Sequence, residues 1–132
     1  MTKYILLAPF LIFACNSFTD PIIESENFNS AYKQAEADKD RDGPGCYMEC
    51  RFDPYFGGEF QSIMRACFKT LDKPEVKTFE TVLAVDENGE IAKVWLNLKT
   101  NLSLCALDSI AQLKFPSPPF SPYHARITMN LE

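Results

Sequence analysis

Two stretches of the chain carry apolar residues at the spacing of one helical face. Between Gly58 and Pro74 the apolar positions follow an i, i+3, i+4, i+7 pattern, on Phe60, Ile63, Met64, Cys67, Phe68 and Leu71. A second stretch, from about Ser103 to Leu113, repeats this spacing on Leu104, Leu107, Ile110 and Ala111. Pro74 follows the first stretch and the segment FPSPPFSP follows the second, and proline cannot continue a helix. The pattern predicts two amphipathic helices.

A different periodicity indicates three strands. Thr78 to Val85 and Ile91 to Leu98 are rich in β-branched and aromatic residues, and the DENG sequence between them supplies the left-handed position of a tight turn at Gly89. These segments predict a β-hairpin. Apolar residues then alternate with polar ones, as in a strand with one buried and one solvated face: Tyr123, Ala125, Ile127, Met129 and Leu131 with His124, Arg126, Thr128 and Asn130.

The elements follow one another as α, β, β, α, β. Each helix has one apolar face that needs cover, so the order predicts an α+β two-layer sandwich, a three-stranded antiparallel sheet with both helices on one face. A chain of 132 residues with 46% hydrophobic content fits one domain of this kind. We assign residues 46–132 to it.

The residues before this domain have a different composition. Residues 16–45 are acidic and polar, and such a segment buries too little apolar surface to offset the ordering of its backbone. It is predicted to be a tether with at most one helix, Phe28 to Ala37, because Phe28, Ala31, Tyr32 and Ala35 recur at helical spacing.

Residues 1–15 have the layout of a secretory signal. Lys3 precedes an apolar run that is too short to span a membrane and that ends in small residues. The last four residues, Ile12 to Cys15, resemble a bacterial lipobox, in which the cysteine becomes lipid-modified. Ordinary signal cleavage near Ala14 or Ser17 is the alternative. Both versions predict export, and Asn16 after Cys15 resembles outer-membrane sorting in enteric-type bacteria. We expect an outer-membrane lipoprotein on the periplasmic side, or else a soluble periplasmic or secreted protein.

Charge and cysteine content narrow the class further. The net charge of −5, without a basic stripe, lacks the electrostatic attraction that dominates nucleic-acid binding. If Cys15 carries lipid, the remaining cysteines are even in number and can form two disulfides in an oxidising compartment: Cys46, Cys50, Cys67 and Cys105. A four-thiolate zinc site is the alternative, but the spacing of Cys46 and Cys50 is unusual for one.

The region MRACFKTLDKPEVKTFETVLAVDENGEIAKVWLNLKTNLSLCALDSIAQLKFPSPP resembles the TonB carboxy-terminal domain superfamily, and within it the gliding-motility-type branch. In members of this branch, a helix with a cysteine is followed by a strand, a D-x-x-G turn, a second strand, a helix with a second cysteine, and then the sequence Phe-Pro-x-Pro. The resemblance implies a disulfide between Cys67 and Cys105, which leaves Cys46 and Cys50 to each other. It covers roughly residues 60–131.

The chain also departs from TonB energy transducers. Those proteins keep an inner-membrane helix and a long proline-rich spacer, whereas this tether of about 30 residues spans only about 30 Å as a flexible coil. From the resemblance we therefore expect the fold and the disulfide of the superfamily in this chain, but not energy transduction.

One acidic segment matches a metal-binding pattern. Residues 38–49 fit the calcium-loop sequence D-x-D-x-D-G-x5-E, with oxygen ligands expected from Asp38, Asp40, Asp42 and Glu49. Pro44 and Gly45 stand where such loops form a short strand, so a plain charged tether is the competing interpretation. Apart from calcium, no cofactor is expected.

The sequence shows no catalytic motif. The single histidine, His124, falls on the polar side of the last predicted strand, and no nucleophile elbow or phosphate loop is present. The leading hypothesis is a non-enzymatic, lipid-anchored TonB-like domain that binds a cell-envelope protein or peptide along its last strand, at Tyr123, Ala125, Ile127 and Met129. A periplasmic inhibitor or immunity-type protein and a weak calcium-binding envelope protein are the alternatives.

Overall fold

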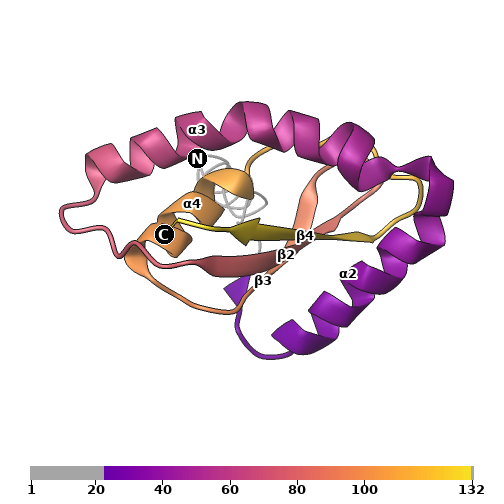
Figure 1. Ribbon diagram of the computed structural model, residues 1–132, viewed down its shortest axis with the longest axis horizontal. Helices are drawn as coiled ribbons and strands as arrows, with labels where there is room; N and C mark the ends of the chain where they lie inside the picture. The colour runs from indigo at the N-terminus through magenta and orange to yellow at the C-terminus, as the bar shows by residue number, and fades with distance from the viewer. Residues whose placement is uncertain (1–22, 132) are drawn as a thin grey trace, which may run out of the picture.

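The computed structural model describes residues 23–131. Three helices and four strands make up the fold (Figure 1). In chain order they are β1 (Ile23–Glu24), α2 (Phe28–Asp42), α3 (Asp53–Thr70), β2 (Phe79–Val85), β3 (Ile91–Leu96), α4 (Asn101–Ile110) and β4 (Tyr123–Met129). A 3₁₀ turn (Gly43–Gly45) and a π-helical turn (Tyr47–Phe52) connect α2 to α3. The α+β class predicted from the sequence is confirmed.

The predicted hairpin is present as β2 and β3. Its turn places Gly89 at φ 82°, and Asp86 Oδ1 accepts hydrogen bonds from the backbone N–H groups of Asn88 and Glu90. A side chain at Gly89 would also collide with the Phe115 carbonyl, because its Cβ would lie 1.9 Å from that oxygen. Glycine is therefore required at this turn for conformation and for space.

The sheet has one strand more than predicted. Its order is β1-β3-β2-β4, and β3, β2 and β4 form the antiparallel set. The short β1 adds to the outer side of β3 in parallel, pairing Ile23 with Val94 and Glu24 with Trp95. The prediction of a three-stranded antiparallel sheet is therefore wrong: the sheet is mixed and four-stranded. Two residues are too few to produce a periodic signal in the sequence.

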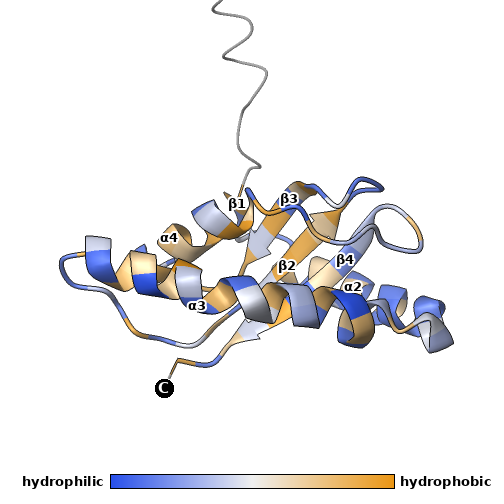
Figure 2. Cartoon of the chain, turned by 90° about the horizontal axis from the view of Figure 1, so that it is seen from above, coloured by the Kyte–Doolittle hydropathy of each residue, from blue (hydrophilic) through white to orange (hydrophobic). Residues whose placement is uncertain are grey.

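Both faces of the sheet are covered, so the two-layer prediction is also wrong. Helices α3 and α4 cover the main core, whereas α2 packs on the opposite face (Figures 1 and 2). The main core takes alternate side chains of each strand, and the second cluster consists of Ala31, Ala35, Val82, Ala84 and Trp95.

Residues 28–42 are thus part of the folded domain, where the sequence predicted a tether. Helix α2 also runs five residues beyond the predicted end at Ala37. The helix itself was predicted, but its packing on the sheet was not, because its buried positions are only Ala31, Ala35 and Asp38.

Helix α3 begins earlier than predicted and α4 somewhat earlier. Asp53 and Pro54 start α3 ahead of Gly58, where the apolar pattern had placed its beginning. Thr100 caps α4 through a reciprocal pair of bonds with Ser103, at 2.8 and 3.0 Å.

Two disulfides are present. Cys67 of α3 is bonded to Cys105 of α4, here called the helix–helix disulfide, and Cys46 to Cys50, here called the corner disulfide. The helix–helix disulfide is the pairing that the family resemblance implied. Neither pair holds free thiolates for zinc.

The predicted signal, with its lipid site Cys15, lies outside the described residues. Within residues 23–131, no helix combines the length and the hydropathy needed to cross a membrane.

Candidate functional site

Strand β4 lies at one edge of the sheet, with β2 on its inner side only. Residues of an antiparallel strand point their backbone groups alternately toward one neighbour and then the other. The N–H of His124 is bonded to Asp38 Oδ2 of α2, so it points away from β2. By the same alternation, the backbone groups of Arg126 and Thr128 also point outward. Among residues 23–131, no hydrogen-bond partner occupies these outward groups of Arg126 and Thr128.

Asp38 closes the first part of this edge. Its carboxylate is buried, with 4% of the residue exposed, and accepts from the His124 N–H at 2.8 Å and from Gln34 Nε2 at 2.8 Å. His124 Nδ1 lies 2.8 Å from the same Oδ2 atom, and the imidazole ring packs 5.5 Å from the Trp95 ring. These contacts fix α2 to the start of β4. The edge is therefore open only from Arg126 onward.

Arg126 holds the next turn of α2 against the strand. Its guanidinium lies over the Tyr32 ring, donates to the Tyr32 hydroxyl and pairs with Glu36 at 3.0 Å. The side chain is thus held on the α2 face, while its backbone groups remain at the edge.

A groove runs along the other side of the open edge, between β4 and the first half of α3. It has a volume of about 540 Å³ and is lined by Asp53, Phe56, Gly57, Phe60 and residues 126–130. Gly57 lines this groove, and a Cβ at that position would have no atom within 4 Å, so a larger side chain can be accommodated there. The neighbouring Gly58 is equally open but does not line the groove. An extended chain pairing with β4 would place alternate side chains into this groove.

The four residues predicted to bind a partner are placed differently from the expectation. Tyr123, Ala125, Ile127 and Met129 have 0, 0, 7 and 2% of their surface exposed. Their backbone groups pair with β2, and their side chains belong to the core beneath α3 and α4. The strand does lie at an edge of the sheet, as predicted. Its outward-pointing backbone groups, however, belong to His124, Arg126 and Thr128, which alternate with the four predicted residues. Only the Ile127 and Met129 side chains also reach the groove.

The four predicted calcium ligands do not gather around one point. Asp38, Asp40 and Asp42 lie on the continuous helix α2. Asp38 faces His124, Asp42 accepts from the Tyr47 N–H at 2.6 Å, and Glu49 pairs with Lys39 at 3.5 Å. Residues 23–131 contain no group of three or more His, Cys, Asp or Glu side chains placed to hold a metal ion.

Two buried tyrosines lie beside the start of β4, with ring centroids 4.7 Å apart. Tyr47 donates to the Pro116 carbonyl at 2.7 Å, and burial raises its pKa well above the ordinary value. Burial also raises the pKa of Tyr123 to about 12, and the nearby carboxylates of Asp42, Asp38 and Asp53 add to the rise. The Tyr123 hydroxyl has no hydrogen-bond partner among the described residues.

The sequence did not indicate the groove or the outward direction of Arg126 and Thr128. Gly57 lay just outside the predicted helix, which began at Gly58, so its place inside an amphipathic helix, where a glycine can signal a packing or functional role, was missed. Which alternate residues face outward depends on pairing with β2 and could not be read from periodicity. Phe115, the first residue of the FPSPPFSP segment before β4, packs inward: it is 3% exposed, and its ring stacks on the Phe52 ring with centroids 4.5 Å apart.

Comparisons of the chain with protein-family models, curated proteins and solved structures give no significant match.

Proposed function

We propose that this protein is an exported, lipid-anchored, non-enzymatic domain of the TonB-like kind, which binds an extended segment of a cell-envelope protein along β4. The observation that supports the proposal is the open edge at Arg126 and Thr128 beside a groove whose lining includes Phe56, Phe60 and Ile127. Backbone pairing at such an edge supplies affinity, and the groove supplies specificity through alternate side chains.

The geometry defines the segment that would fit. Pairing begins after His124, where Asp38 occupies the outward N–H, so the partner strand pairs with Arg126 and Thr128 and spans about five residues. Side chains on its α3 side enter a groove bounded by Phe56, Phe60 and Ile127, which favours aliphatic or aromatic residues. Side chains on its other side lie near Arg126 and Glu36.

Two pairs of variants test the binding mode. Thr128→Pro removes an outward N–H and leaves the pairing with β2 intact, whereas Thr128→Ala keeps the N–H. Gly57→Leu fills the groove, whereas Gly58→Leu adds the same side chain to α3 outside it. Peptides selected on the wild-type protein from a random 12-residue library serve as the probe, and circular dichroism verifies that each variant is folded.

The proposal expects a loss of at least tenfold in peptide affinity for Thr128→Pro and Gly57→Leu, with little change for the two controls. Amide shifts on binding should centre on residues 126–130 and 56–60. Selected peptides that bind both variants as tightly as wild type, or a library that yields no binder, would refute it. Intact mass of the protein from its own membranes tests the anchor, by the lipid added at Cys15.

A further inference from the structure

Exposed apolar side chains gather in two segments of the domain, one around the end of α3 and one around the start of α4. Within residues 23–131, the large hydrophobic side chains with more than a third of their surface exposed are Phe68 at 42%, Val76 at 45%, Leu98 at 38% and Leu104 at 40%. They occur in only two segments, 68–77 and 98–104. Single exposed apolar residues are ordinary, but a group of them marks an interaction surface.

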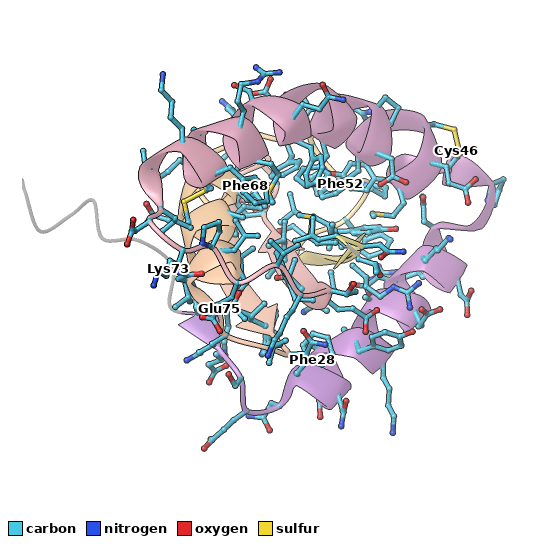
Figure 3. All side chains as sticks on the ribbon, turned by 60° about the vertical axis from the view of Figure 1, so that its left-hand side comes forward. Phe28, Cys46, Phe52, Phe68, Lys73 and Glu75 are labelled. Carbon is cyan, nitrogen blue, oxygen red and sulfur yellow. A yellow bond between two sulfur atoms is a disulfide. The ribbon has the colours of Figure 1, made fainter. Side chains whose placement is uncertain are left out.

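Specific contacts join the two segments. The helix–helix disulfide, with Cα atoms 6.0 Å apart, connects the residue before Phe68 to the residue after Leu104. The Asn101 side chain donates to the Lys73 carbonyl at 2.8 Å and accepts from the Glu75 N–H at 2.8 Å. Figure 3 shows Phe68, Lys73 and Glu75 on the side of the molecule away from Cys46. We name these two segments together the lysine-rich end.

The charge of this end is opposite to that of the whole chain. It carries Lys69, Lys73, Lys77 and Lys99, all exposed, against the two acids Asp72 and Glu75, while the chain as a whole has a net charge of −5. Three of the lysines directly follow an exposed apolar residue, in the pairs Phe68-Lys69, Val76-Lys77 and Leu98-Lys99. Apolar groups interleaved with lysines match the boundary between lipid headgroups and acyl chains.

We infer that the lysine-rich end docks on the surface of an anionic lipid bilayer. The apolar side chains enter the boundary region, and the lysine ammonium groups lie among the phosphates, each contributing attraction that falls off within a Debye length. This inference extends the membrane attachment proposed above, because it adds a protein surface to the lipid anchor.

The length of the N-terminal segment is compatible with this orientation. The chain enters the fold at Ile23, which pairs with Val94 of β3. The eight residues from Cys15 to Ile23 reach at most about 28 Å. A lipid on Cys15 would therefore keep the domain within contact distance of the bilayer.

The test separates this surface from the anchor. The full chain is made with Cys15→Ala, so that no acyl group is attached, and is sedimented with vesicles of three parts phosphatidylcholine to one part phosphatidylglycerol. Every variant keeps the same N-terminal segment, so any contribution from that segment cancels in comparisons. The test pair is a double variant that combines Lys69→Glu and Lys99→Glu. The control pair is a double variant that combines Lys33→Glu and Lys114→Glu, and so removes two exposed lysines outside the lysine-rich end.

Each lysine near the bilayer surface should contribute about fivefold to vesicle affinity. The test variant should therefore lose at least about 25-fold in affinity, and the control variant about twofold or less. Phe68→Ser should also weaken binding, and salt should weaken wild-type binding. Equal losses in the test and control pairs would overturn the inference, as would equal binding to purely neutral vesicles. A dimer that Phe68→Ser dissociates, without vesicle binding, would show that a second copy covers this end.

Discussion

Replacing Asp38 by alanine should loosen α2 from the sheet. The Asp38 carboxylate accepts from the His124 N–H and from Gln34 and contacts His124 Nδ1, each at 2.8 Å. Hydrogen bonds to charged groups contribute about 1.5–3 kcal/mol each, and a buried donor left without a partner adds a cost of its own. Water can enter from the cleft of about 190 Å³ beside His124 and replace part of these bonds.

We therefore expect Asp38→Ala to lower the free energy of unfolding by about 2–3 kcal/mol. Urea unfolding at pH 7, followed by circular dichroism, should show the midpoint falling by about 1–2 M. Trp95 packs against the His124 ring, so its fluorescence reports the local change.

Asp40→Ala provides the matched control. Asp40 lies two residues further along α2 and is exposed, and alanine favours a helix more than aspartate does. This variant should be as stable as wild type or slightly more stable. A loss below about 0.5 kcal/mol for Asp38→Ala, or equal losses for the two variants, would refute the role given to Asp38.

Three further predictions concern stability. Tyr123→Phe should leave stability unchanged or raise it, because its hydroxyl has no partner among the described residues, whereas Tyr47→Phe should cost about 1 kcal/mol through loss of its bond to Pro116; thermal unfolding distinguishes them. The raised pKa of a buried tyrosine stabilises the fold below pH 10, and this contribution is lost as pH rises through about 12. Wild type should therefore lose stability above pH 10, and Tyr123→Phe should lose less. Replacing the two cysteines of the helix–helix disulfide by alanine should lower the free energy of unfolding by about 4 kcal/mol, because they are 38 residues apart. The same change at the corner disulfide, with a separation of 4, should lower it by only about 2 kcal/mol. Similar urea midpoints for the two variants would contradict this.

Periodicity alone located the elements that have strong patterns. The hairpin, both amphipathic helices and the last strand were predicted, because each carries many large apolar residues at regular spacing. Their limits were less certain, as at α3, which begins five residues before the predicted start at Gly58.

The α2 layer could not be predicted in the same way. Its buried positions are Ala31, Ala35 and Asp38. The spacing of the two alanines helped to predict a helix, but two small residues and a carboxylate do not form an apolar face large enough to predict packing on a sheet. What holds α2 in place is the pairing of Asp38 with His124, 86 residues further along the chain. Such a contact depends on the final fold, and so does the outward direction of Arg126 and Thr128.

The two borders of the sheet are unequal, and this limits how the molecule can assemble. On the β3 side, β1 covers Val94 and Trp95, and Lys93 pairs with Glu24 at 2.9 Å, so a second strand has little room to add there. Strand addition at the β4 border alone would join two copies edge to edge, and a pair formed in this way would have no open β4 border left to extend it.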